Sequence, residues 1–294
     1  MTTRTPVSTD LSYLLHRPAV RSTAVVFASP HSGRRYPASF LRRAALDENA
    51  IRSSEDAFVD DLYASVVAQG APLLAAQAPR AYLDLNRGPE ELDPAVIEGV
   101  RRHAHNPRIA SGLGVIPRVV SNGRAIYNGK LSLVEAHDRI TKVWRPYHDM
   151  LQTLMDEANS AFGEAILIDC HSMPHEAVKN LSTYNAVRPD VVLGDRFGAA
   201  AASSVVEQIE AAFAAAGFNV ARNMPFAGAF VCQTYGRPSR GHHAVQVEID
   251  RSLYMDEVAI KPNGNYAAIK AALESVIVEI AGIGRGADRA LAAE

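Results

Sequence analysis

The chain of 294 residues carries 30 Lys and Arg residues against 32 Asp and Glu residues, a formal net charge of -2, and 48% of its residues are hydrophobic. This composition is typical of a globular enzyme and excludes disordered and fibrous chains, while the near-neutral charge argues against a partner that is a nucleic acid or a membrane surface. Two cysteines are too few for a disulfide framework or for a zinc site built from cysteines alone.

Neither a targeting segment nor a membrane span is expected. The first residues, MTTRTPVSTD, are polar, and no apolar run approaches the roughly 20 residues needed to cross a bilayer. We therefore expect a cytoplasmic protein without a membrane partner, in which Cys170 and Cys232 are reduced thiols.

Short buried strands and amphipathic helices alternate along most of the chain. Strands are predicted where apolar or β-branched runs end in loop residues, and helices where apolar residues recur at spacings of three and four. In chain order we expect a strand at 24–30, a helix at 55–69, strands at 72–77 and 81–85, one or two helices over 131–161 that Pro146 kinks or restarts, strands at 165–170 and 191–193, a helix at 197–216, strands at 218–221, 229–234 and 244–249, and a helix at 265–283.

Residues 88–130 differ from the rest, because they are rich in Gly, Pro, Asn and Arg and lack a sustained apolar period. A long irregular segment of this kind is usually functional. The chain shows no internal repeat and no Ser/Gly linker, so we expect one domain over 1–294. The alternation predicts an α/β fold of three αβα layers with a mostly parallel or mixed central sheet.

Familiar catalytic motifs are missing. The segment GRAIYNGK at 123–130 has five residues between its glycines where a P-loop has four, and a leucine follows where a P-loop has Ser or Thr. The chain contains neither a G-x-S-x-G nucleophile motif nor an H-E-x-x-H zinc motif. Any catalytic site must therefore be assembled from residues that are far apart in the sequence.

Polar clusters follow several predicted strands, at the edge where α/β sheets bind ligands. His31 follows the first strand, His171 follows the strand at 165–170, and an acid, Glu55 or Asp56, begins the helix predicted at 55–69. A single loop histidine is usually ordinary, but two histidines at strand ends and a carboxylate form the ligand set of a hydrolytic zinc site with one open position. We therefore expect one Zn²⁺ per chain.

Glu248 alternates with apolar residues in the strand predicted at 244–249. A buried carboxylate is costly unless it has a partner or a function. The structural interpretation is a salt bridge with Arg251 or Arg237. The functional interpretation is a general base beside a metal-activated water, with a pKa raised by burial.

Asn86 and Arg87 close the strand predicted at 81–85. An arginine fork and an amide suit a substrate carboxylate, although a surface arginine and a turn asparagine are the simpler interpretation. Arg80 is a candidate for stabilising an oxyanion. Cys170 is a poor candidate nucleophile, because it and the neighbouring His171 point to opposite sides of a strand.

Several of these segments together resemble the N-formylglutamate amidohydrolase family. The likeness extends from about Val25 to Tyr254. The segments are SPHSG followed by YP, EDAFVDDLY, RAYLDLNR, GLGVIPR, IYNGKLSLVEAHDRI ending in PYH, IDCHSMP, DVVLGDRFG, NMPFAGAF and QVEIDRSLYMDE. Each is weak alone, and their number and order carry the resemblance.

The resemblance implies a phosphorylase/hydrolase-like fold, similar to zinc carboxypeptidases and aspartoacylase-type deacylases. Carboxypeptidases have their acid in H-x-x-E, whereas Gly33 and Arg34 follow here, so the acidic ligand must come from Glu55 or Asp56, and we expect Asp56. Carried over residue by residue, the resemblance implies zinc ligands His31, Asp56 and His171, the base and proton shuttle Glu248, the carboxylate clamp Asn86 and Arg87, and the oxyanion stabiliser Arg80.

The resemblance further implies a zinc-dependent amidohydrolase that hydrolyses N-formyl-L-glutamate to formate and L-glutamate, at the end of histidine degradation. Its partner is then a small N-acyl amino acid, with Arg87 binding one carboxylate and Arg118, Arg124 or Arg237 the other. A deacylase of another N-acyl amino acid and a metal-free binding or regulatory protein on the same fold remain alternatives.

Overall fold

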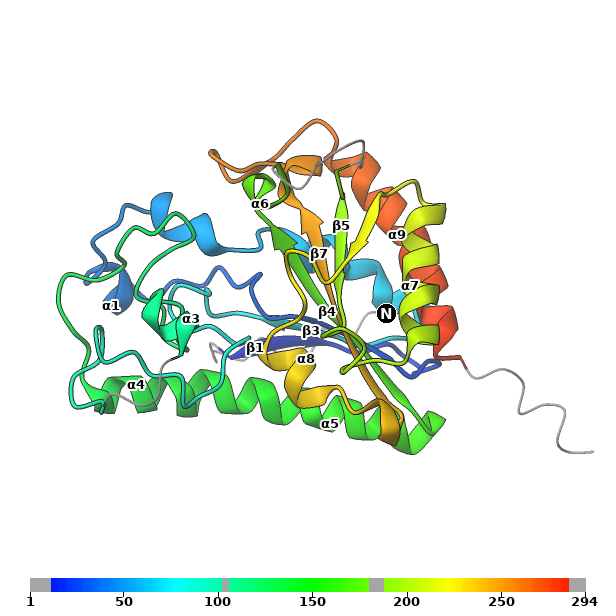
Figure 1. Cartoon of the computed structure of the whole chain (residues 1–294), viewed down its shortest axis with the longest axis horizontal. Coiled ribbons are helices and arrows are strands. Elements are labelled where there is room, and N and C mark those ends of the chain that lie inside the picture. The colour runs from blue at the N-terminus through cyan, green and yellow to red at the C-terminus, as the bar shows by residue number, and fades with distance from the viewer. Residues whose placement is uncertain (1–11, 102–105, 180–187, 286–294) are drawn as a thin grey trace, which may run out of the picture.

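A seven-stranded mixed sheet in the order β1-β3-β2-β4-β7-β5-β6 forms the centre of the computed structural model, which describes residues 12–101, 106–179 and 188–285 (Figure 1). Neighbours pair in parallel, except that β1 is antiparallel to β3 and β5 is antiparallel to β7. The strands are β1 (Tyr13–His16), β2 (Val25–Ser29), β3 (Leu73–Ala76), β4 (Ala165–Met173), β5 (Val191–Gly194), β6 (Val220–Arg222) and β7 (His242–Asp250), with a separate pair β8 (Met255–Asp256) and β9 (Lys261–Pro262).

Helices connect most of these strands. They are α1 (Ala38–Leu41), α2 (Val59–Leu62), α3 (Pro107–Ala110), α4 (Leu133–Arg139), α5 (Arg145–Phe162), α6 (His175–Lys179), α7 (Ser203–Ala215), α8 (Phe230–Tyr235) and α9 (Tyr266–Ile283). Four short 3₁₀ turns lie at Ala50–Ser54, Ala64–Gln69, Pro238–Arg240 and Arg251–Leu253. Within the described ranges, none of the helices combines the length and the apolar character that crossing a bilayer requires.

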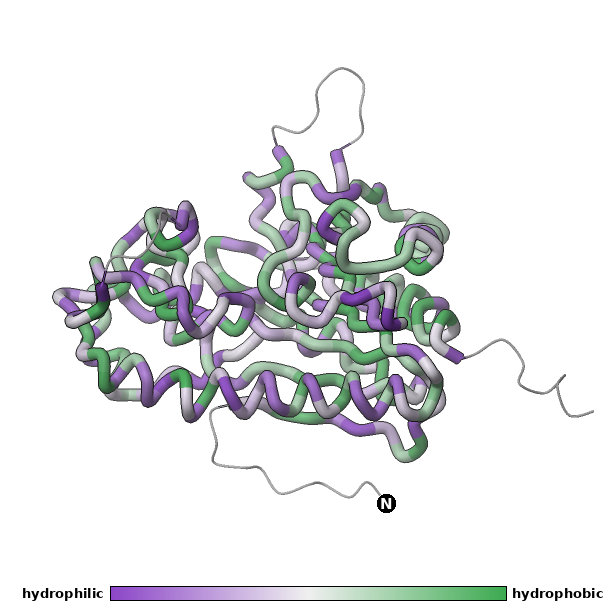
Figure 2. The backbone as a smooth tube through the Cα atoms, turned by 60° about the horizontal axis from the view of Figure 1, so that its bottom comes forward, coloured by the Kyte–Doolittle hydropathy of each residue, from purple (hydrophilic) through white to green (hydrophobic). Residues whose placement is uncertain are grey.

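The two faces of the sheet bury separate apolar cores. Val26 and Leu167 face α5 and α8, whereas Val25, Phe27 and Ile168 face α7 and α9. This alternation follows from the period of two along a strand. Figure 2 shows hydrophobic and hydrophilic residues alternating along the long helix α5, as expected for a helix with one buried face. The predicted α/β fold of helices on both sides of a mixed sheet is confirmed.

The helical segment predicted over 131–161 is confirmed and is divided in two. The helix α4 passes into a π-helical stretch at Ile140–Trp144, and α5 then continues to Phe162. Pro146 is the second residue of α5, which directly follows the π-helical stretch, and proline has no N–H to donate to the preceding turn. The expected restart at Pro146 therefore coincides with a change in helix geometry.

The helix predicted at 55–69 is wrong. Only the single turn of α2 and the 3₁₀ turn at Ala64–Gln69 are helical, and Phe58 at the start of α2 adopts a left-handed conformation with φ 67°. The backbone N–H of Asp56 donates to the carbonyl of His31 at 3.0 Å. This bond to another segment holds Asp56 outside a helix.

Two predicted strands are also wrong. Residues 81–85 form a turn, in which the N–H groups of Tyr82 and Leu83 both donate to the carbonyl of Pro79. Residues 229–234 lie in α8, because a short apolar run fits a buried helix as well as it fits a strand. The helix predicted at 197–216 begins later, at Ser203, and strand β1 was not predicted.

Candidate active site

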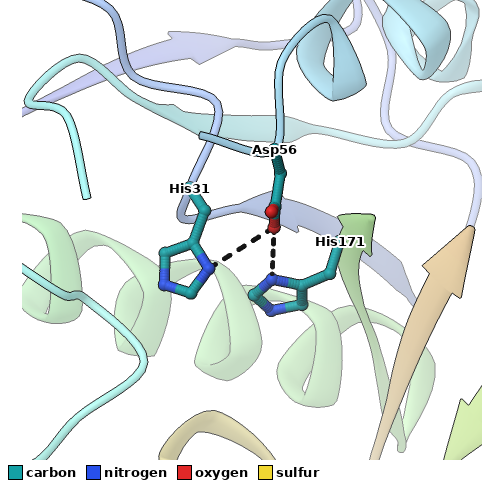
Figure 3. A group of neighbouring side chains, drawn as sticks. All are labelled: His31, Asp56 and His171. Carbon is teal, nitrogen blue, oxygen red and sulfur yellow. Dashed lines mark hydrogen bonds and ion pairs between the residues drawn. The ribbon is translucent and has the colours of Figure 1, made fainter. Parts of the chain in front are cut away.

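Three segments that are far apart in the sequence meet at one edge of the sheet (Figure 3). His31 follows the end of β2, and His171 lies near the end of β4, its parallel neighbour. Asp56 comes from the loop between the 3₁₀ turn at Ala50–Ser54 and α2. Because parallel strands end at the same edge, the two histidines converge on the carboxylate between them.

The two imidazole rings face the same carboxylate oxygen. Oδ2 of Asp56 lies 2.9 Å from Nδ1 of His171 and 3.4 Å from Nδ1 of His31. The ligand atoms of the three residues all lie within 4.8 Å of one another, and each residue is at most 2% exposed. The other oxygen of Asp56 accepts a hydrogen bond from Nη2 of Arg251 at 2.8 Å. Asp56 therefore presents one oxygen to the space between the rings.

The residues of this cluster fit a metal ion. Nδ1 of His31 is buried and has no hydrogen-bond partner within the described part of the chain. Two imidazole nitrogens and a carboxylate oxygen are ligands that zinc accepts, and a buried ring nitrogen without a hydrogen-bond partner is available to a metal ion. The His31–Asp56–His171 cluster could therefore hold a divalent cation.

The electrostatics of the cluster also favour a cation. Burial tends to raise the pKa of Asp56, but its contacts with His171 and His31 hold that pKa well below the usual range. Burial tends to lower the pKa of His171, but the carboxylates of Asp169, Asp56 and Glu248 raise it well above its usual value. The surrounding acids therefore stabilise positive charge at this point of the structure.

Glu248 lies on β7, where it is the register partner of His171 on β4. Burial raises the pKa of Glu248 to about 7, against opposing effects of His171 and Arg80. Its Oε1 accepts a hydrogen bond from Nε2 of Gln246 at 2.8 Å. Among the described residues Glu248 has no ion pair, since Arg251 is paired with Asp56. The carboxyl group therefore lies beside the cluster without a cation of its own.

Glu55 and Asp56 point in different directions, although they are adjacent. The carboxylate of Glu55 accepts hydrogen bonds from Arg52 and from the hydroxyl of Tyr36, which lies 2.6 Å away. These partners hold Glu55 away from the histidines. Asp56 is the acid that the structure brings to the cluster.

The three other residues with expected roles lie in the segment 80–87, in which Asp84 contacts His31 and Asn86 contacts His171. Arg80 is a quarter exposed and donates through Nε to Asp84 at 3.0 Å. Partial loss of contact with water tends to lower the pKa of Arg80, but the negative charges of Asp84, Asp56 and Glu248 raise it. Asn86 is buried, and its side chain donates to Asp169 at 3.2 Å.

Arg87 is 8% exposed, and burial lowers its pKa. It donates through Nε to the carbonyl of Leu113 at 3.0 Å and through Nη1 to the carbonyl of Asn86 at 2.7 Å. The roles of Arg80, Asn86 and Arg87 toward a substrate stay predictions.

Two buried acids beside the histidines received no role from the sequence. Asp84 lies 2.7 Å from Nε2 of His31, and Asp169 lies 3.0 Å from Nε2 of His171. Asp169 precedes His171 by two residues on β4, so the period of a strand places the two side chains on the same side. That spacing is a signal that the sequence carries. For Asp84 the sequence carries no such signal, because its segment is not a strand.

A cavity of about 1240 Å³ opens between the irregular segment and α8, lined among others by Glu91, Arg108, Arg118 and Phe230. Of the arginines considered for a second substrate carboxylate, Arg118 lines this cavity and pairs with Asp93 at 3.0 Å. Arg124 is exposed, and Arg237 donates to the carbonyls of Gln233 and Gly236.

Known proteins resemble this chain over most of its length. Residues 23–255 match the family described as N-formylglutamate amidohydrolase. The N-formylglutamate deformylase of Pseudomonas aeruginosa is 29% identical over 259 residues, which cover 87% of this chain and 90% of that protein. The enzyme of the same name from Pseudomonas putida is 28% identical over 79% of this chain and 82% of its own length. The crystal structure of N-formylglutamate amidohydrolase from Ralstonia eutropha JMP134 superposes with a TM-score of 0.87 and 34% identity, covering 94% of this chain and 99% of that one.

Proposed function

Because the chain belongs to the N-formylglutamate amidohydrolase family, we propose that it is a zinc-dependent amidohydrolase that converts N-formyl-L-glutamate and water into formate and L-glutamate. The observation that carries this proposal is the buried His31–Asp56–His171 cluster with Glu248 beside it. The names of the Pseudomonas relatives support the substrate. The product L-glutamate would place the reaction at the end of histidine degradation, in the cytoplasm.

His31, Asp56 and His171 would hold the zinc ion. When bound, zinc supplies Lewis-acid chemistry, which polarises a carbonyl oxygen and lowers the pKa of water. The protein shields this site from solvent, since all three residues are at most 2% exposed. Electrostatic interactions are stronger there than in water.

Glu248 is the general base and the proton shuttle of the proposed reaction. Its carboxylate accepts a proton from the attacking water as the C–O bond to the formyl carbon forms. The same proton then passes to the amide nitrogen as the C–N bond breaks, which gives formic acid and the free amine. The proton of the acid then moves to the amine, so that formate and the ammonium form of L-glutamate leave. A pKa of about 7 suits both steps, because the group can accept and release a proton near neutral pH.

Arg80 is the candidate for stabilising the negative oxygen of the tetrahedral intermediate. Its Nε is engaged by Asp84, while its two Nη groups have no hydrogen-bond partner among the residues that the structure describes. A donor of this kind typically contributes about 3 to 4 kcal/mol to transition-state stabilisation.

Arg87 and Asn86 are proposed to bind a substrate carboxylate. Arg87 uses Nε and Nη1 within the protein, which leaves Nη2 without a partner in the described part of the chain. The amide of Asn86 holds Asp169 and accepts the N–H of Val231. Arg87 would therefore be the direct contact, and Asn86 would fix its surroundings. Arg118, Arg124 or Arg237 would contact the second carboxylate.

A hydrolysis panel tests this function. Zinc-loaded protein is offered N-formyl-, N-acetyl- and N-succinyl-glutamate together with N-formyl derivatives of neutral amino acids. We expect N-formyl-L-glutamate to have the highest kcat/KM, activity to disappear on chelation, and zinc to restore it. A preference for another acyl group would indicate a related deacylase. Full activity after metal removal would exclude the zinc mechanism, and binding without hydrolysis would indicate a binding protein.

A further inference from the structure

Each histidine of the cluster has a carboxylate on the ring nitrogen that faces away from Asp56. Nε2 of His31 lies 2.7 Å from Oδ1 of Asp84, and Nε2 of His171 lies 3.0 Å from Oδ2 of Asp169. We propose that Asp84 and Asp169 are positioning residues, which keep the proton of each imidazole on Nε2 and thereby leave Nδ1 of His31 and His171 free to bind the metal. This inference rests on the proposed function.

The contacts of Asp84 and Asp169 bear on which nitrogen of each imidazole ring carries the proton. A neutral imidazole carries one N–H, and the nitrogen that lacks the hydrogen is the one that can bind a metal. An ionised carboxylate can only accept a hydrogen bond, so Asp56 at Nδ1 and Asp169 at Nε2 favour a proton on both nitrogens of His171 while no metal is bound. A metal ion shared by Nδ1 and Asp56 would leave a single proton on Nε2, where the outer carboxylate accepts it. That carboxylate also fixes the direction of the ring and makes the opposite nitrogen a stronger ligand.

Asp84 is held firmly enough to act in this way. It is 1% exposed, and its Oδ1 accepts the backbone N–H of Asn86 at 2.8 Å besides facing His31. Its Oδ2 accepts Nε of Arg80 at 3.0 Å. Because Arg80 and the backbone of Asn86, both in the same turn as Asp84, each hold one of its oxygens, the direction of the carboxylate toward His31 is fixed.

Asp169 is difficult to explain by stability alone. It is fully buried, and none of the described arginines or lysines forms an ion pair with it. Its Oδ2 accepts Nδ2 of Asn86 at 3.2 Å, while its Oδ1 has no hydrogen-bond partner in the described ranges. A buried carboxylate with an unpaired oxygen costs stability. A role in orienting His171 accounts for its position.

Zinc affinity tests the inference on the full chain. Asp84→Asn and Asp169→Asn keep the size of each side chain and remove its charge. Zn²⁺ is titrated against a chromophoric chelator, and we expect each variant to bind zinc about 10- to 100-fold more weakly than the unmodified protein. Asp250→Asn is the matched control, because Asp250 is also buried and lies 2.8 Å from Nδ1 of His175 outside the cluster. Its zinc affinity should not change.

Nitrogen-15 NMR of the imidazole rings gives a second readout that needs no variant. In the zinc-loaded protein we expect His31 and His171 both to carry the proton on Nε2 and to bind through Nδ1. A spectrum with the proton on Nδ1 of either ring would overturn the inference. So would unchanged zinc affinity in both folded asparagine variants.

The two proposals fail in different ways. If the unmodified protein binds no zinc, the metal mechanism and this inference both fail. If the unmodified protein binds zinc and hydrolyses its substrate while the asparagine variants bind zinc equally well, only the inference fails. Loss of thermal stability without loss of zinc affinity would indicate that Asp84 and Asp169 are structural, and would also overturn it.

Discussion

Burial makes the ionised form of Glu248 less favourable and raises its pKa, and this suits the proposed role of Glu248 as a general base. The strand β7 places the carboxyl group beside His171, and burial raises its pKa to about 7. A carboxylate in water would be too weak a base near neutral pH to take a proton from water efficiently. The local environment therefore determines the reactivity of this residue.

Replacing Glu248 by glutamine should abolish most of the activity while leaving the metal in place. Glutamine has the same size and can still contact Gln246, but it cannot take up a proton. General acid–base catalysis typically contributes about 10²- to 10⁴-fold, so kcat should fall by that factor with unchanged zinc content, measured by steady-state kinetics and metal analysis. Glu207→Gln on the exposed side of α7 is the control. Normal turnover in Glu248→Gln would rule out the base.

Arg251 should matter for stability because it compensates the buried charge of Asp56. Its Nη2 donates to Oδ1 of Asp56 at 2.8 Å, and both groups are buried. Removing one partner of a buried pair typically costs about 3 to 5 kcal/mol. We expect Arg251→Met to lower the free energy of unfolding of the metal-free protein by that amount, measured by urea denaturation.

An exposed pair is the control for that prediction. Arg17 and Glu157 are 47% and 37% exposed and lie 2.8 Å apart. Surface pairs contribute about 0 to 1 kcal/mol, so Arg17→Met should have little effect. Equal losses in the two variants would show that burial of the Arg251–Asp56 pair has no special importance.

The sequence was informative about the histidines and less informative about the acids. His31 and His171 could be singled out because each follows an apolar strand. The choice between Glu55 and Asp56 depends on which side each points to, and that is set by Arg52 and Tyr36, which bind Glu55. Contacts of this kind are formed by tertiary structure, so the spacing of residues does not contain them.

At the scale of elements, the predictions failed where the site imposes its own geometry. The segment 55–69 has helical spacing, yet Asp56 is bonded to the backbone of His31 and Phe58 is left-handed. The segment 81–85 has strand-like spacing, yet it turns so that Asp84 can reach His31. Strands β2, β4 and β7 carry no such constraint on their backbone, and their apolar pattern predicted them correctly.

His148 joins α5 to α8 and to the turn at 81–85, and it should make stability depend on pH. Its Nε2 donates to the carbonyl of Leu85 at 2.9 Å, and its Nδ1 accepts the hydroxyl of Tyr235 at 2.9 Å. Burial lowers its pKa to about 4. Below a pH of about 6.5, His148 therefore takes up a proton in the unfolded chain but stays neutral in the folded protein, and folding becomes less favourable.

The size and the pH range of this effect follow from the lowered pKa of His148. A difference of one between the folded and unfolded pKa corresponds to about 1.4 kcal/mol, so the loss of stability should approach about 3 kcal/mol between pH 6.5 and pH 4. Below pH 4 this group should cause no further loss. Urea denaturation of the metal-free His148→Gln variant should show a shallower fall over that range than the unmodified protein. His16→Gln, at an exposed histidine, is the control. An unchanged fall in His148→Gln would contradict the prediction.

At the scale of the whole molecule, the sheet order determines which distant segments meet. The strands β2, β4 and β7 are consecutive in the sheet and parallel, so residues that follow or end them gather at one edge. The alternation of strands and helices predicted such a sheet. It did not predict that β5 would pair antiparallel with β7, or that β1 would extend the opposite edge, because pairing order is not a local property of the sequence.

The proposed zinc site should couple metal binding to the stability of the entire fold. Its ligands are far apart in the sequence: Asp56 lies 25 residues after His31, and His171 lies 115 residues after Asp56. The unfolded chain therefore does not bring them together. A ligand that binds only the folded state raises the free energy of unfolding by about 2.7 kcal/mol at a concentration 100 times its dissociation constant, and by about 4 kcal/mol at 1,000 times. Removing the metal should lower stability by the same amount.

Thermal denaturation in chelator and in rising concentrations of zinc measures this coupling. We expect the midpoint temperature of the unmodified protein to rise with zinc concentration, and that of His31→Ala to be independent of zinc, because a cluster of two ligands holds the ion far more weakly. His175→Ala is the matched control, since His175 pairs with Asp250 outside the cluster and its loss should leave the zinc dependence intact. If His31→Ala responds to zinc as fully as the unmodified protein does, the stabilising ion binds elsewhere, and the edge of the sheet where β2 and β4 end is not the metal site.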